Sequence, residues 1–160
     1  MKKVYRSHVL LLLIFTSPFL QCQNLSVQTD AGKQALSRAD LEALPHVKVT
    51  ASEHGSAPVT FEGVTLKSVL EKAGVTFGES MKGKRLTNCL LVEAADGYRV
   101  VIALPELDPA FTDKQIVLAL LRDGKPLGEK EGPYRIVIPD EKRMARWVRQ
   151  VTMLKIVDVQ

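Results

Sequence analysis

The feature that most restricts the fold of this chain is a series of short apolar runs separated by turn residues. Three such runs, at residues 115–122, 134–138 and 148–157, lie in the last third of the chain. Asp123-Gly124 follows the first run and Gly132-Pro133 precedes the second, and both dipeptides are typical of turns. Apolar runs bounded by turn residues are typical of buried strands. The last third of the chain therefore predicts strands.

More strands are predicted upstream. Apolar runs at 88–94 and 98–103 are joined by Ala95-Asp96-Gly97, which has the composition of a hairpin turn. Residues 46–52 alternate apolar and polar side chains, and 58–62 form a second short strand. The polar stretch 24–33 predicts a single short first strand or a connecting segment.

Two short helices interrupt these strands. Ser37 precedes one, with Asp40 at the spacing of a capping box. Thr65 caps the other, which Gly74 ends. Strands and helices do not alternate regularly, so the fold class predicted is α+β, a mostly β mixed-sheet domain with short helices.

The N-terminus predicts an export signal over residues 1–22, followed by one domain over 23–160. A basic start leads into the apolar run 9–15, which is shorter than the about 20 residues needed to span a bilayer. No other run of this kind follows, so no transmembrane segment is expected in the mature chain. The expected location is periplasmic or secreted. Lipid anchoring at Cys22 stays open, although Gln21 is not the small residue that a lipoprotein signal places before its cysteine.

Charge and cysteine content exclude several classes of protein. The formal net charge of +4 includes three cations and no acid from residues 1–22, which leaves +1 on the domain. A charge this small gives no support for nucleic-acid binding. Cys22 and Cys89 are the two cysteines, so there is no disulfide framework and no Cys-x-x-Cys motif. The apolar core must stabilise the domain.

One segment concentrates the candidate binding groups. Four cations and Trp147 lie close together at 142–149: Lys142, Arg143, Arg146 and Arg149. Guanidinium groups suit a phosphate, and the aromatic ring suits a flat ligand, so a small anionic ligand is expected. A solvated basic surface is the alternative.

Two further candidates lie outside this segment. Arg135 lies within an apolar strand, where an inward side chain would require a carboxylate partner or an anion, and an outward one would be ordinary alternation. His54 follows Glu53 on a turn, where it is either a proton-transfer group or a plain turn residue. Both pairs of alternatives stay open at this point.

Five motifs in order resemble the molybdopterin-binding domain of sulfite-oxidase-type oxidoreductases, in particular its short, exported, stand-alone members. They are FEGVTL at 61–66 with Val69-Leu70 and Ala73-Gly74 behind it, EAADGY at 93–98, DGKPL at 123–127, GPYRIVIP at 132–139 and Arg146-Trp147. The resemblance implies the sulfite-oxidase type of fold and molybdopterin as cofactor. Together with the chemistry of the residues themselves, it makes Arg135, Arg143, Arg146, Trp147 and His54 the candidate cofactor-binding residues, and it implies a periplasmic electron-transfer partner.

The chain departs from this family at the metal. In catalytic members a cysteine of the strand before the FEGVTL-like motif binds the metal, and here Ala51 and Ser52 occupy that region. Glu131 stands where the family has a histidine, and Met144 where it has a phosphate-binding serine. No metal ligand is therefore assigned. Two functions are compatible with the sequence: a molybdopterin-dependent oxidoreductase-like protein, or a non-catalytic ligand-binding or interaction module on the same fold.

Overall fold

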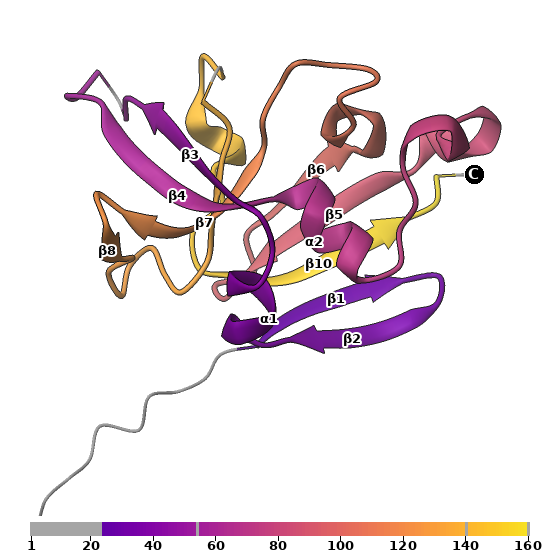
Figure 1. The fold of residues 1–160 in the computed structure, drawn as a ribbon, viewed down its shortest axis with the longest axis horizontal. Helices are drawn as coiled ribbons and strands as arrows, with labels where there is room; N and C mark the ends of the chain where they lie inside the picture. The colour runs from indigo at the N-terminus through magenta and orange to yellow at the C-terminus, as the bar shows by residue number, and fades with distance from the viewer. Residues whose placement is uncertain (1–23, 54, 140, 160) are drawn as a thin grey trace, which may run out of the picture.

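Two sheets of five strands each make up most of the domain (Figure 1). The computed structural model describes residues 24–53, 55–139 and 141–159. The predicted export signal and Cys22 lie outside these ranges. The predicted α+β fold class, a mostly β mixed-sheet domain with short helices, is confirmed. No helix within the described ranges is both long and apolar enough to cross a membrane.

The first sheet joins the two ends of the domain. Its strands, in spatial order, are β2 (Gly32–Leu36), β1 (Leu25–Thr29), β10 (Val151–Val157), β5 (Cys89–Ala94) and β6 (Arg99–Ala103). The pair β1–β10 is parallel, and the other pairs are antiparallel. Strand β10 lies between β1 and β5 in this sheet, so the segment that precedes β10 is fixed at its C-terminal end by sheet structure.

The second sheet carries the residues that matter for binding. It consists of β3 (His46–Ala51), β4 (Val59–Thr65), β7 (Val117–Arg122), β8 (Lys125–Pro126) and β9 (Arg135–Val137). Strand β7 pairs with β4 on one side and with β8 and β9 on the other. The apolar runs at 115–122 and 134–138 therefore contain strands, and within this sheet these strands form antiparallel pairs.

Helices α1 (Arg38–Glu42) and α2 (Leu66–Lys72) begin where the sequence predicts. The Ser37 hydroxyl accepts a hydrogen bond from the backbone N–H of Asp40, whose carboxylate accepts one from the Ser37 N–H in return. The Thr65 hydroxyl accepts from the N–H of Ser68 in the same way. Gly74 follows α2 at φ 89°, a conformation that glycine adopts without steric cost.

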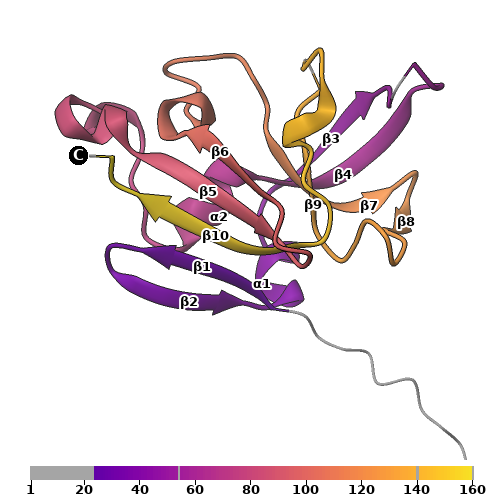
Figure 2. The same ribbon diagram turned by 180° about the vertical axis from the view of Figure 1, so that it is seen from behind.

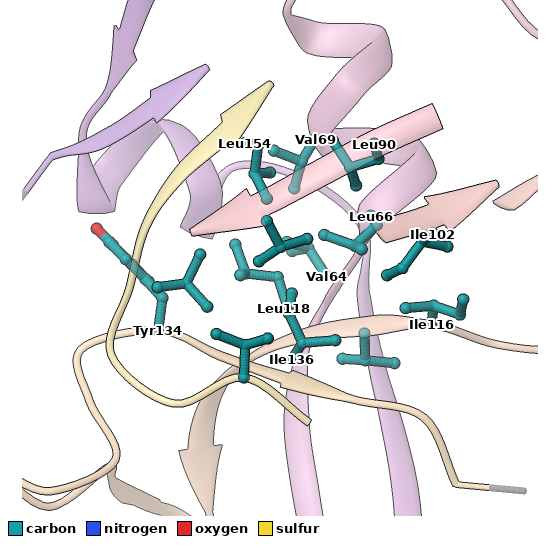
Figure 3. Packing of buried hydrophobic residues seen from close by; sticks show 14 of the residues in the cluster. Val64, Leu66, Val69, Leu90, Ile102, Ile116, Leu118, Tyr134, Ile136 and Leu154 are labelled. Atoms are coloured by element: carbon teal, nitrogen blue, oxygen red, sulfur yellow. The ribbon is translucent and has the colours of Figure 1, made fainter. Parts of the chain in front are cut away.

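The core lies between the two sheets and is completed by α2 (Figure 3). Leu66 and Val69 of α2 meet Leu118 of β7, Leu90 of β5 and Leu154 of β10, and all five are fully buried. Burial of one such side chain stabilises the fold by about 1.5–3 kcal/mol. Cys89 is unpaired and is the one cysteine within the described ranges. The apolar core therefore stabilises this part of the chain without a disulfide.

Gly63 explains why the FEGVTL motif has a glycine. The pairing of β4 with β7 shifts register between Glu62 and Gly63. At that point the two backbones lie so close that a Cβ on Gly63 would stand 2.1 Å from the carbonyl oxygen of Leu118. A residue with any side chain would force the two central strands apart.

One local prediction was incomplete. Residues 24–33 predict at most one strand, but the structure has a β1–β2 hairpin, and in β2 only Leu36 is buried. Between α2 and β5 the chain also forms 3-10 helices at Gly78–Ser80 and Gly83–Thr87. The hairpin of β5 and β6 around Gly97 is confirmed.

Candidate functional site

Two segments meet at one end of the second sheet and enclose a cavity of about 590 Å³. One segment follows β3, and the other connects β9 to β10 and contains the 3-10 helix Met144–Arg146. In Figure 2 this second segment lies beside the end of β3. The cavity is lined by Ser52 and Gly55 of the first segment, Arg135 of β9, and Glu141, Lys142, Arg143, Met144, Ala145, Trp147 and Arg149 of the second.

Arg135 points inward and is paired with two carboxylates. It is 1% exposed. Its guanidinium donates to Glu131 Oε1 at 2.9 Å through Nη1 and to Glu53 through Nη2. Arg122 Nη1 lies 3.0 Å from Glu53 Oε2 and 2.9 Å from Glu131 Oε1. Two guanidiniums and two carboxylates thus form one cluster, which we call the Arg135 cluster (Glu53, Arg122, Glu131 and Arg135).

The charges of the Arg135 cluster cancel formally. Burial alone would raise the pKa of Glu53, but the hydrogen bond and charge of Arg135, with the charges of Arg122 and Arg149, lower it below its ordinary value. Glu53 is therefore ionised at neutral pH and compensates Arg135. The sequence left the direction of Arg135 open, and the structure shows the inward alternative with carboxylate partners.

Two aromatic rings hold the buried guanidinium in place. The guanidinium carbon of Arg135 lies 5.2 Å from the ring centroid of Phe61 and 5.6 Å from that of Trp147. The two rings meet edge to face, with centroids 6.1 Å apart. Trp147 is 5% exposed and donates its indole N–H to the carbonyl of Ile138 at 3.0 Å. Trp147 thus forms a fixed wall of the cavity and supports Arg135.

Arg146 is bound by carboxylates and does not line the cavity. Its Nε donates to Glu141 Oε1 at 2.7 Å, and its two terminal nitrogens lie 3.3 Å from the carboxylate oxygens of Glu106. Burial opposes the charged form, but these two carboxylates raise the pKa of Arg146 above its ordinary value. Arg146 therefore ties the segment before β10 to the 3-10 helix Leu104–Leu107.

Three other cations at the cavity are not compensated in this way. Lys142, Arg143 and Arg149 are exposed, and within the described ranges none of them forms a hydrogen bond or an ion pair. The excess positive charge of the site comes from these three side chains, because the charges of Arg135 and Arg146 are balanced by their carboxylates. The arrangement suits a ligand whose anionic group lies near the surface and whose remainder enters the cavity.

The position of His54 lies outside the described residues, so its predicted role stays a prediction. The sequence offered no means of finding Glu53 and Glu131 as partners of Arg135. A charged residue in an apolar strand indicates that a partner exists, but Glu53 lies far away in the sequence. Arg149 was identified only as one of several cations, and its place in the cavity became apparent from the fold.

The fold resembles a solved enzyme structure. The sulfane dehydrogenase SoxCD from Paracoccus pantotrophus superposes with a TM-score of 0.65 at 21% sequence identity. The match covers 88% of this chain and 40% of that one, so this chain spans less than half of the SoxCD chain. At this identity the likeness shows a shared fold. No curated protein matches the sequence significantly.

Family membership is decided by a second comparison. The model of the oxidoreductase molybdopterin-binding domain matches residues 21–160, nearly the whole chain. The chain belongs to this family. The resemblance to sulfite-oxidase-type domains is thereby confirmed, and molybdopterin is the cofactor that the oxidoreductase molybdopterin-binding domain binds.

The cavity fits the phosphate of that cofactor better than its metal. Its uncompensated cations suit the phosphate of molybdopterin. A thiolate for the metal is not available among its described lining residues, because Cys89 is half-buried on β5 and does not line the cavity. Of the two residues that occupy the region of the family's cysteine, Ala51 is buried and Ser52 lines the cavity. Within the described ranges, no cluster of three or more potential metal ligands is found.

Proposed function

We propose that this protein is an exported member of the oxidoreductase molybdopterin-binding domain family that holds a pterin-type anionic cofactor through its basic C-terminal segment. The observation that carries the proposal is the cavity of about 590 Å³ whose rim bears three uncompensated cations. Cavities of 300–1,000 Å³ are typical of small-molecule sites. The phosphate would lie against Lys142, Arg143 and Arg149, and the pterin beside Trp147.

The balanced clusters have a different role in this proposal. The Arg135 cluster and the ion pairs that Arg146 forms with Glu106 and Glu141 contribute little net charge. Their role is therefore to position the binding residues more than to attract the anion. Arg135 fixes the wall formed by Trp147, and Arg146 fixes the segment that carries Arg143. Because this support is preorganised, the wall of the site needs little rearrangement when the ligand binds.

A second candidate function is a non-catalytic binding module. It is favoured by the absence of a cysteine at Ala51 and Ser52, the region where the family's catalytic members have their metal-binding thiolate; Ser52 lines the cavity with a hydroxyl instead. This module would hold the pterin without the protein ligand that supports metal chemistry. An oxidoreductase, in contrast, would require an electron-transfer partner that takes up or supplies the electrons of the reaction. With the export signal predicted over 1–22, either function would be carried out in the periplasm or outside the cell.

The proposal is tested by binding of a fluorescent pterin phosphate to the purified mature protein, followed by titration. Arg143→Ala and Arg149→Ala are each expected to weaken binding about tenfold, which corresponds to about 1.4 kcal/mol for a lost charge-assisted hydrogen bond. Arg99→Ala is the matched control, because Arg99 is exposed on β6 and does not line the cavity. Equal affinities for the three variants and the wild type would contradict the proposed role of the basic segment.

A further inference from the structure

The segment that carries Arg149 has one residue more than the strand opposite it. Two backbone hydrogen bonds join this segment to β9 and the residue before it: the N–H of Ile136 donates to the carbonyl of Val148 at 2.8 Å, and that of Val151 to the carbonyl of Tyr134 at 2.9 Å. Between these bonds, Arg149 and Gln150 stand opposite the single residue Arg135. We call this extra-residue arrangement the Arg149 bulge (Arg149 and Gln150), since an inserted residue disrupts the regular alternation of side chains and redirects them.

The Arg149 bulge brings two cations to the same cavity. Arg135 and Arg149 both line it. The charge of Arg149 also helps to lower the pKa of Glu53, which is a carboxylate partner of Arg135. Arg149 is exposed, and within the described ranges its side chain forms no hydrogen bond or ion pair. The direction of the Arg149 side chain therefore depends on its backbone.

Gln150 gives this backbone a conformation that few side chains tolerate. Its φ is 49°, in the left-handed region. Residues with a side chain rarely adopt this region, and β-branched residues adopt it least, because the Cβ approaches the following carbonyl oxygen. Such a conformation persists where the surrounding contacts impose it.

Three hydrogen bonds hold Gln150 in the left-handed conformation. Its N–H donates to the carbonyl of Glu131 at 2.9 Å, and its carbonyl accepts from the N–H of Ala95 at 3.0 Å. Its side-chain amide donates to the carbonyl of Glu129 at 2.7 Å. These bonds connect the segment before β10 to the β5–β6 turn and to the loop that carries Glu131. Because Glu131 is also a carboxylate partner of Arg135, Gln150 is bonded directly to the backbone of the Arg135 cluster.

We propose that Gln150 is a positioning residue, whose left-handed backbone holds Arg149 at the cavity rim beside Arg135, where it binds the phosphate of the ligand. This inference rests on the proposed function and adds to it the residue that orients one of the three rim cations. Gln150 itself does not line that cavity, so it acts on the ligand through Arg149.

The test compares two substitutions that remove the same side-chain hydrogen bond but differ in backbone preference. Glycine adopts positive φ without steric cost, and valine strongly disfavours it. We measure the affinity of the mature protein for a fluorescent pterin phosphate. Gln150→Gly should bind within about twofold of the wild type, and Gln150→Val should bind about tenfold more weakly, which matches the loss expected for Arg149→Ala.

A double-variant comparison separates positioning from a general structural effect. In the Arg149→Ala background, Gln150→Val should weaken binding by less than about twofold, because no guanidinium remains to be positioned. Gln34→Val is the matched control, since Gln34 is exposed on β2 and does not line the cavity. Gln150→Ala, which disfavours positive φ less than valine does, replaces Gln150→Val if that variant does not fold, and should show a smaller loss of the same kind.

The possible outcomes are distinct. If folded Gln150→Val binds as tightly as the wild type, the inference is overturned while the proposed function stands. The same holds if Gln150→Val weakens binding by an equal factor with and without Arg149. If the folded wild type does not bind the pterin phosphate, both the inference and the proposed function are overturned.

Discussion

Replacing Glu53 tests how much the Arg135 cluster contributes to stability. Arg135 is 1% exposed, and Glu53 is one of its two carboxylate partners. Glu53→Gln would keep the size of the side chain but remove its charge. Arg135 would then share the single carboxylate of Glu131 with Arg122, and its Nε already lacks a hydrogen-bond partner. Removing one partner of a buried ion pair costs about 3–5 kcal/mol.

The expected loss is near the lower end of that range, because Glu131 keeps one contact to Arg135. We therefore expect Glu53→Gln to lower the free energy of unfolding by about 3 kcal/mol. Urea denaturation followed by tryptophan fluorescence measures this, since Trp147 is the one tryptophan of the chain and lies against Arg135. The slope of the transition should stay constant, so that the midpoint reports stability alone.

Two variants serve as controls for this experiment. Glu62→Gln removes a carboxylate whose partners, Lys48 and His46, are 69% and 33% exposed, and should cost less than about 1 kcal/mol. Arg135→Met combined with Glu53→Gln removes both buried charges, and should be more stable than Glu53→Gln alone because no uncompensated guanidinium remains. A loss below about 0.5 kcal/mol for Glu53→Gln would refute the view that the Arg135 cluster is a balanced, buried unit.

Three other predictions concern Gly63 in the second sheet, the protonation of Glu53, and Ser52 at the cavity. Gly63→Ala should lower the free energy of unfolding by about 3 kcal/mol or more, because the new Cβ would stand 2.1 Å from a backbone oxygen of β7. Thermal unfolding measures this loss, and Gly128→Ala is the control because a Cβ at Gly128 would meet open space. The free energy of unfolding of the wild type should fall as the pH drops below 4.5, the ordinary pKa of a glutamate, because the pKa of Glu53 is lowered in the folded protein and the unfolded chain therefore takes up the proton first. Measured as a function of pH in the acid range, the stability of Glu53→Gln should show a smaller fall. Ser52→Cys should place a reactive thiol in the cavity, so that a thiol reagent labels it faster than it labels Cys89, and bound pterin phosphate should slow this labelling. Labelling at the rate of Cys89 would show that residue 52 does not face the site.

Local sequence signals predicted much of the fold. Ser37 and Thr65 determine helix starts through hydrogen bonds to residues three positions away, so the sequence contains the whole signal. The Asp96-Gly97 turn determines the β5–β6 hairpin for the same reason. Strand β2 was missed because its exposed polar residues lack the alternation that marks a half-buried strand, and its pairing with β1 follows from the hairpin.

The site was less predictable because its contacts join distant segments. Arg135 indicated a need for a partner, but the partner Glu53 lies 82 positions away in the chain. Arg146 matched a family motif, yet its neutralisation by Glu106 and Glu141 depends on the position of the Leu104–Leu107 turn. For the same reason, the sequence could not separate Arg143 and Arg149, which line the cavity, from Arg146, which does not.

The most direct test of the account is the cofactor content of the mature protein purified from its native envelope. Fluorescence of the oxidised pterin and elemental analysis of molybdenum should be measured on the wild type and on the Arg143→Ala/Arg149→Ala double variant. We expect near-stoichiometric pterin in the wild type and a strong reduction in the double variant, while the molybdenum content decides between the oxidoreductase and the non-catalytic module. Folded wild-type protein without pterin would contradict the central claim that the basic segment holds this cofactor.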